Sequence, residues 1–121
     1  MARIIIIDDD AVLRDILSPT LTDAGHTVTI TVNGFDGVKA FRAEPADIIL
    51  TDIMMPYGGL PTIRVLRAEF PHLKIIAMSG GGQPRLDIAQ GLGANRTLAR
   101  PFESKELLTA IDELMGAGPT P

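Results

Sequence analysis

Short apolar runs alternate five times with segments of helical periodicity along the 121 residues. The expected strands are residues 4–7, 27–32, 48–52, 74–79 and 96–99. Helical patterns cover about residues 12–24, 36–43, 61–70, 84–92 and 107–115. Strands joined by helices of roughly ten residues pair in parallel through right-handed crossovers. The alternation therefore predicts a doubly wound α/β fold, a five-stranded parallel sheet with helices on both faces.

The polarity of these runs indicates the order of the strands. Residues 4–7, 48–52 and 74–79 are almost wholly apolar, which is typical of strands buried on both faces in the middle of a sheet. Residues 27–32 and 96–99 carry Thr and Arg and suit the edges. This favours the order 2-1-3-4-5, in which ligands bind beyond the carboxyl ends of the first and third strands.

The composition excludes several classes of function. Eleven Lys and Arg against fifteen Asp and Glu give a net charge of -4, with no excess cation for a nucleic-acid backbone or an anionic membrane. No cysteine is present and only two histidines are, which argues against disulfides, a thiolate nucleophile and a zinc site built on Cys or His. No apolar run approaches the length of a signal peptide core or a membrane span. We expect a cytoplasmic protein that binds neither nucleic acid nor membranes.

Polar side chains end four of the five expected strands. They are Asp8, Asp9 and Asp10 after the first strand, Asp52 at the end of the third, Ser79 at the end of the fourth and Arg100 after the fifth. Parallel strands end at one edge, so these groups gather there. Asp10 is expected to cap the following helix. The carboxylates of Asp8, Asp9 and Asp52 repel one another unless a proton or a cation intervenes. Magnesium, which prefers oxygen ligands and keeps waters and phosphate oxygens, fits best.

The same edge offers groups suited to an anion. Ser79 carries a hydroxyl, and Arg100 carries a permanent charge with planar donors. A carboxylate nucleophile, a metal ion, a hydroxyl and a cation together are the parts needed for phosphoryl transfer onto an aspartate. The residues therefore predict a domain that receives a phosphoryl group.

At these positions the chain resembles the receiver domain of bacterial two-component response regulators. The resemblance spans residues 2–115 and rests on an ordered set of motifs. They are Asp8-Asp9-Asp10 after the isoleucine run, Leu50-Thr51-Asp52-Ile53-Met54-Met55-Pro56, Met78-Ser79 and Arg100-Pro101-Phe102. It implies a flavodoxin-like (βα)5 receiver domain over residues 1–115, with residues 116–121 as a flexible tail or the start of a linker. Either the domain works alone, or it belongs to a longer regulator or hybrid kinase.

The resemblance also implies roles for the acidic residues. Asp52 would be the phospho-acceptor, taking its phosphoryl group from a phosphohistidine on a sensor histidine kinase or a histidine phosphotransfer protein. Asp9, Asp52 and the backbone carbonyl of Met54 would bind Mg²⁺ or Mn²⁺, with Asp8 contributing through water. The chain would be no enzyme beyond its own phosphorylation and autodephosphorylation.

Further implied roles concern the phosphoryl group and its effect. Ser79 and Arg100 would bind the phosphoryl oxygens, and the bond before Pro101 would be cis. Phosphorylation would change a surface formed by the fourth helix, the fifth strand and the fifth helix, which binds a downstream protein partner.

Two positions depart from the family's usual pattern, and two more bear on the lifetime of the phosphoryl group. Arg100 replaces a Lys, and Thr97 replaces the Tyr or Phe whose ring normally moves in the switch. We therefore expect the switch to use residues 80–82 and the fourth helix. Met54 and Gly81 flank the path of the hydrolytic water in the family, and neither side chain can orient water by hydrogen bonding. We expect slow autodephosphorylation.

Two other functions compete with this interpretation. A pseudo-receiver would act as an interaction module without phosphorylation, which fits the changes at Thr97 and Arg100. A phosphatase of the haloacid dehalogenase type would use Asp8 as nucleophile and Asp10 as acid/base. That class needs a further acidic pair at a downstream strand end and leaves Asp52 unexplained.

Overall fold

The computed structural model describes residues 2–53, 59–80 and 83–116. Its five parallel strands lie in the order β2-β1-β3-β4-β5. The strands are β1 (Arg3–Ile7), β2 (Thr27–Thr31), β3 (Ile48–Asp52), β4 (Lys74–Ser79) and β5 (Arg96–Ala99). The helices are α1 (Ala11–Asp23), α2 (Gly34–Ala43), α3 (Leu60–Glu69), α4 (Gln83–Leu92) and α5 (Ser104–Leu114). The predicted fold class and strand order are confirmed.

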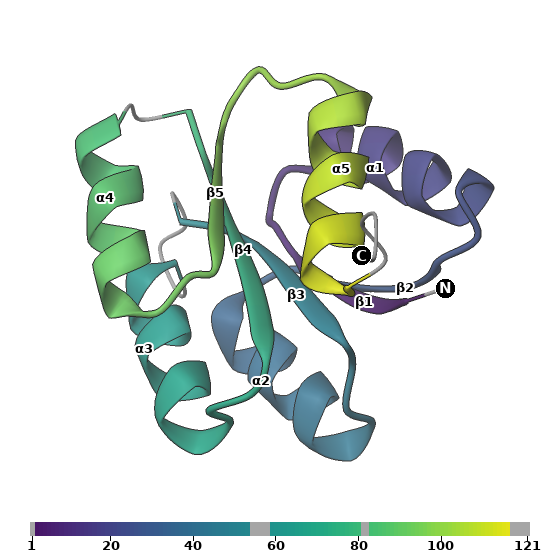
Figure 1. The fold of residues 1–121 in the computed structure, drawn as a ribbon. Helices are drawn as coiled ribbons and strands as arrows, with labels where there is room; N and C mark the ends of the chain where they lie inside the picture. Colours follow the sequence, from purple (N-terminus) through teal and green to yellow (C-terminus); the bar gives the residue numbers. More distant parts are fainter. Residues whose placement is uncertain (1, 54–58, 81–82, 117–121) are drawn as a thin grey trace.

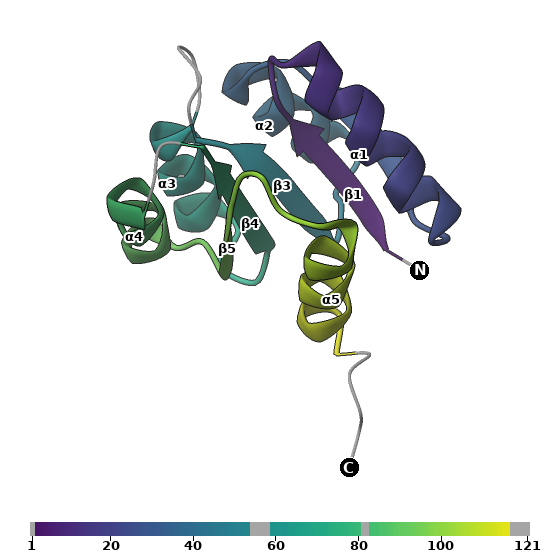
Figure 2. The same ribbon diagram turned by 90° about the horizontal axis from the view of Figure 1, so that it is seen from above.

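Each face of the sheet builds its own hydrophobic core, because successive residues of a strand point to opposite faces. Ile5 and Ile7 pack with buried residues of α2, α3 and α4, whereas Ile4 and Ile6 pack with α1 and α5. Figures 1 and 2 show these two layers of helices on either side of the sheet. The central strands β1, β3 and β4 are buried almost throughout, and the edge strands β2 and β5 are partly exposed. None of the helices in the described ranges is long and apolar enough to cross a bilayer.

Hydrogen bonds from Arg67 fix the C-terminal end of α4. Arg67 on α3 donates to the carbonyl of Gly93 at 2.8 and 3.1 Å and to Oδ1 of Asn95 at 2.7 Å. The same Asn95 oxygen accepts the backbone N–H of Ile75 at 2.9 Å. Gly93 has a φ of 125°, a conformation that favours glycine. The end of α3, the end of α4 and the start of β4 are therefore fixed together.

Gly59 shapes the entry to α3, the element that follows the end of β3. Its φ of 60° and ψ of -126° are open to glycine and costly for other residues. A Cβ at this position would also lie 2.6 Å from the backbone carbonyl oxygen of Ile53. Backbone atoms cannot rotate out of the way as the end of a side chain can. The backbone conformation and the close contact therefore both destabilise the fold when any other residue replaces Gly59.

We expect Gly59→Ala to lower the free energy of unfolding by about 2 kcal/mol or more. The measurement is urea unfolding followed by circular dichroism. Gly91→Ala on α4 is the matched control, because a Cβ there meets no other atom within 4 Å. That change should be neutral or stabilise by up to about 1 kcal/mol. Equal midpoints for Gly59→Ala and the wild type would contradict the close contact.

Candidate functional site

Three carboxylates meet at the carboxyl edge of the sheet. Asp8 and Asp9 follow β1, and Asp52 ends the neighbouring strand β3, whose Thr51 pairs with Ile7. One carboxylate oxygen from each of the three acids lies within 4.8 Å of the others. Asp8 is 0% and Asp52 2% exposed, whereas Asp9 is open to solvent. The structure thus brings together the acids that the sequence placed at this edge.

A positively charged side chain lies beside Asp52. The guanidinium Nη2 of Arg100 donates to Oδ2 of Asp52 at 3.1 Å, and both side chains are largely buried. A buried carboxylate needs such a partner, because desolvation of an unpaired charge costs several kcal/mol. From the sequence, Arg100 is expected to bind the phosphoryl group, and its contact with Asp52 itself is an additional finding of the structure. A permanent positive charge after the fifth strand was the signal that could have indicated it.

Two buried polar atoms at this edge have no hydrogen-bond partner. Asp8 receives the backbone N–H of Asp10 on Oδ1 at 2.9 Å, but its Oδ2 has none. Nε of Arg100 is likewise without a partner. Native proteins leave few such atoms unsatisfied. One acceptor and one donor therefore remain for ligands of opposite charge, a cation at Asp8 and an anion at Arg100.

Ser79 and Arg100 are placed next to each other by the pairing of β4 with β5. Ser79 is fully buried, pairs with Ala99, and accepts the backbone N–H of Arg100 on its carbonyl at 2.9 Å. The Arg100-Pro101 peptide bond is cis. Thr97 is half-buried on β5. Met54 and Gly81, the positions assigned to metal binding and hydrolysis, lie outside the described residues.

Asp10 has a structural role in the described chain. Its side chain accepts the backbone N–H groups of Val12 and Leu13 at 3.0 and 3.4 Å. This is the N-cap of α1 that the sequence predicts. Because Asp10 is engaged in this way, it is not poised to act as an acid/base for a neighbouring nucleophile.

Burial changes the titration of Asp8. Desolvation raises the pKa of its carboxyl from the ordinary 3.8 to about 6. The N–H of Asp10 and the charge of Arg100 act against this rise, and the charge of Asp52 adds to it. An acidic site of carboxylate oxygens, one of them unpartnered, fits a hard divalent cation such as Mg²⁺, which would compete with the proton.

The raised pKa of Asp8 predicts how the stability of the metal-free protein depends on pH. A carboxyl with a raised pKa contributes stability that is fully present below about pH 4 and is lost as the pH rises through about 6. Asp8→Asn removes the ionisation. We expect the variant to be more stable than the wild type at pH 7.5, by about 1–3 kcal/mol.

The test is urea unfolding in EDTA from pH 4 to pH 8, where the advantage of Asp8→Asn should shrink as the pH falls. Asp112→Asn on the exposed surface of α5 is the control, since it makes the same change of side chain away from the site. A constant difference between Asp8→Asn and wild type at every pH would show that Asp8 does not titrate as described.

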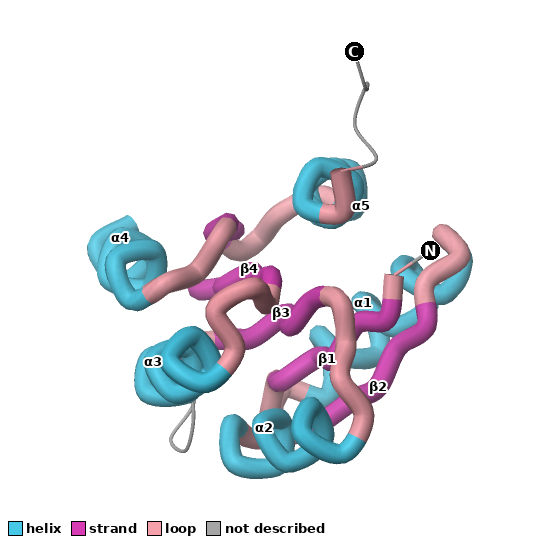
Figure 3. Tube along the Cα trace, turned by 60° about the horizontal axis from the view of Figure 1, so that its bottom comes forward, coloured by secondary structure: helices cyan, strands magenta, loops and turns pink. Residues whose placement is uncertain are grey.

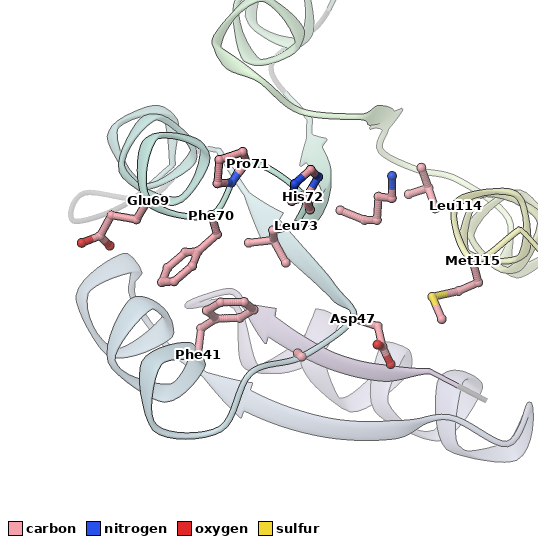
Figure 4. Close-up of a pocket in the computed structure, with 11 residues that line it drawn as sticks. Phe41, Asp47, Glu69, Phe70, Pro71, His72, Leu73, Leu114 and Met115 are labelled. Carbon is pink, nitrogen blue, oxygen red and sulfur yellow. The ribbon is translucent and has the colours of Figure 1, made fainter.

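A hollow of about 570 Å³ lies at the opposite end of the strands, away from the acidic site. Figure 4 shows Phe41 and Phe70 in its wall, with ring centroids 4.5 Å apart. Its carboxylates already have structural partners. Glu69 binds Arg42 at 2.6 Å, and Asp47 accepts the backbone N–H of Arg3 at 2.8 Å. These contacts join elements of the fold, so the acidic edge is the better candidate site.

Known proteins share this fold and sequence. Residues 4–112 match the family described as the response regulator receiver domain. The chemotaxis protein CheY of Thermotoga maritima is 31% identical over 115 residues, which cover 93% of this chain and 96% of CheY. The transcriptional regulator NtrC of Azospirillum brasilense is 31% identical over 122 residues, 99% of this chain. The chain spans about a quarter of NtrC and of FleR from Pseudomonas aeruginosa.

Solved structures agree with these relatives. A receiver domain protein from Clostridium thermocellum has a TM-score of 0.89 at 25% identity, covering 97% of this chain and 96% of that one. CheY4 of Vibrio cholerae has a TM-score of 0.86 at 24% identity over 94% of this chain and 98% of that one, a likeness in fold. With a family match over residues 4–112, this chain belongs to the response regulator receiver domains.

Proposed function

We propose that this receiver domain accepts a phosphoryl group on Asp52 with the help of Mg²⁺. The observation that carries the proposal is the buried Asp52 carboxylate, which lies with Asp8 and Asp9 on one side and the Arg100 guanidinium on the other. Like charges this close favour a divalent cation, and the Arg100 guanidinium favours an incoming anion. The phosphoryl donor is a phosphohistidine on a sensor kinase or a phosphotransfer protein.

Asp8, Asp9 and Asp52 would hold the cation through carboxylate oxygens. When bound, Mg²⁺ offsets the charge of the transferring phosphoryl oxygens. An oxygen of Asp52 forms the new bond to phosphorus as the bond between phosphorus and the histidine nitrogen breaks. The nitrogen keeps the bonding pair and takes a proton from solvent.

Phosphorylation of Asp52 would place a doubly charged phosphoryl group next to the residues that surround it. Arg100 can shift its donors from the carboxylate to the phosphoryl oxygens, and its Nε has no partner to give up. Ser79 lies one position beyond Met78, the residue that pairs with Asp52, and brings a hydroxyl to the same edge. Both residues thus supply donors without any long-range rearrangement of the sheet.

An apolar groove leads to the site and suits a helical phosphodonor. It has a volume of about 540 Å³ and opens beside Arg100 and Gly80. Leu13, Ile16 and Leu17 of α1 form one wall, and Pro101, Phe102 and Leu107 form the other. Val12 and Ile16 stay 69% and 57% exposed along α1. Exposed apolar side chains next to an acceptor suit a kinase or phosphotransfer partner, and the face of α4, β5 and α5 is left for a downstream protein.

The same contacts bear on the two competing functions, a phosphatase and a pseudo-receiver. The N-cap role of Asp10 disfavours a phosphatase that needs this residue as acid/base. A pseudo-receiver that never takes phosphoryl remains the alternative, since Thr97 and Arg100 depart from the usual switch residues. We further propose that the chain does no chemistry on other substrates and acts in the cytoplasm.

Phosphorylation is tested by intact mass after incubation with acetyl phosphate and Mg²⁺. We expect one added phosphoryl group on the wild type, none on Asp52→Asn, and none in excess EDTA. Asp112→Asn, on the exposed surface of α5, is the matched control and should be phosphorylated normally. A folded wild type that takes no phosphoryl group would support the pseudo-receiver, and turnover of a phosphate ester would support the phosphatase.

The lifetime of the phosphoryl group is a separate prediction. Neither Met54 nor Gly81 can orient an attacking water by a side-chain hydrogen bond. Met54→Asn supplies such a group and should raise the rate of phosphoryl loss by about tenfold. The rate is measured by intact mass after the donor is removed. Met54→Leu is the control, and an unchanged rate in Met54→Asn would argue against the role of this position.

A further inference from the structure

The two outer strands of the sheet, β2 and β5, are protected to very different degrees against pairing with strands of other chains. β5 has only four residues, and its Arg96 faces Glu113 of α5 at 3.8 Å. Short strands and charged side chains are the usual means by which edges avoid pairing with other chains. The opposite edge, β2 with the next residue, reads Thr-Val-Thr-Ile-Thr-Val over residues 27–32. It contains no charge and no proline, and every side chain is β-branched.

The outer side of β2 offers backbone groups for pairing. Thr27 donates its N–H to Ala2, and Thr31 accepts the N–H of Asp8, so the alternate residues 27, 29 and 31 face β1. The N–H and C=O groups of Val28 and Ile30 therefore point outward. β2 ends the strand order, and Figure 3 shows β1 on one side of it and no strand of the described chain on the other.

Apolar side chains remain exposed along the same edge. Ile30 is 44% and Val32 43% exposed, and Phe35 at the start of α2 is 78% exposed. These are three of the eight large apolar side chains exposed in the described residues, and they fall within six positions of the sequence. An exposed, uncharged, apolar edge strand is a template for another strand.

We infer that β2 pairs antiparallel with β2 of a second copy of this chain about a two-fold axis at Ile30. In this register Ile30 faces Ile30, and Val28 faces Val32 of the other copy. Val28 and Ile30 carry the backbone groups that point outward, so Ile30 forms a hydrogen-bonded pair with its counterpart at the axis. Thr29 and Thr31 face each other in the remaining pairs.

The register explains why the occupant is a second copy. A two-fold axis perpendicular to the sheet keeps the faces matched, so the apolar row of Val28, Ile30 and Val32 continues into the same row of the partner. Every cross-strand pair joins apolar to apolar or Thr to Thr, and no like charges oppose each other. The sequence of β2 is thus complementary to itself in this register. The proposed dimer leaves Asp52 and its partners unobstructed and stands apart from phosphorylation.

Sedimentation equilibrium over a wide range of protein concentration tests the pairing. We expect a reversible dimer for the wild type. Ile30→Lys sets two like charges opposite each other at the axis and should weaken the dimer by at least about tenfold. Val65→Lys is the matched control, because Val65 on α3 is also 44% exposed. Circular dichroism checks that both variants are folded.

Disulfide trapping tests the register itself, since the chain has no cysteine of its own. Opposed residues of a hydrogen-bonded antiparallel pair have Cα atoms about 5.5 Å apart, within disulfide range. Mild oxidation should therefore link Ile30→Cys into a covalent dimer much faster than Val65→Cys. Equal rates of cross-linking, a monomeric wild type at all concentrations, or a dimer that survives Ile30→Lys would each overturn the proposal.

Discussion

The site depends on the burial of like charges at the point where β1 and β3 end together. Asp8 and Asp52 are almost fully buried on adjacent strands, an arrangement that is unfavourable for both in the absence of a counter-charge. The Arg100 guanidinium supplies one positive charge to Asp52, while desolvation, with a smaller contribution from the charge of Asp52, raises the pKa of Asp8. Three acids within 4.8 Å of one another, with one guanidinium beside them, form a site that could hold a cation. A site already neutralised by protein groups would have no comparable reason to bind one.

The sequence predicts the fold well because the apolar pattern of the strands, their order in the sheet and the positions of the acids are consistent with one another. The isoleucines of β1 and β4 are apolar on both faces, which only a central parallel strand requires, and this sets the order of the sheet. That order in turn places Asp8 and Asp52 side by side, since strands one and three are neighbours. The gathering of the acids is thus a consequence of topology and needs no knowledge of side-chain conformation.

Other features depend on packing that no periodicity encodes. The ion pair of Arg100 with Asp52, the unpartnered Oδ2 of Asp8 and the contacts of Arg67 with Gly93 and Asn95 are set by rotamers and by loop geometry. The sequence shows which residues end a strand and not where a long side chain reaches. The outer side of β2 is similar, because alternating Thr and Val indicate an edge strand without showing which of its backbone groups point away from β1.

Under the proposed function, the fold also determines which end of α4 responds to the site. Arg67 ties the residues after α4 to α3, and the positive φ of Gly93 shapes the turn there. The start of α4 instead follows β4, whose last residue, Ser79, is buried at the acidic edge. Thr97 provides no aromatic ring to carry a change across β5. If phosphorylation of Asp52 displaces Ser79, the proposed function places the response at the start of α4, because the contacts of Arg67 with Gly93 anchor the end of this helix to α3.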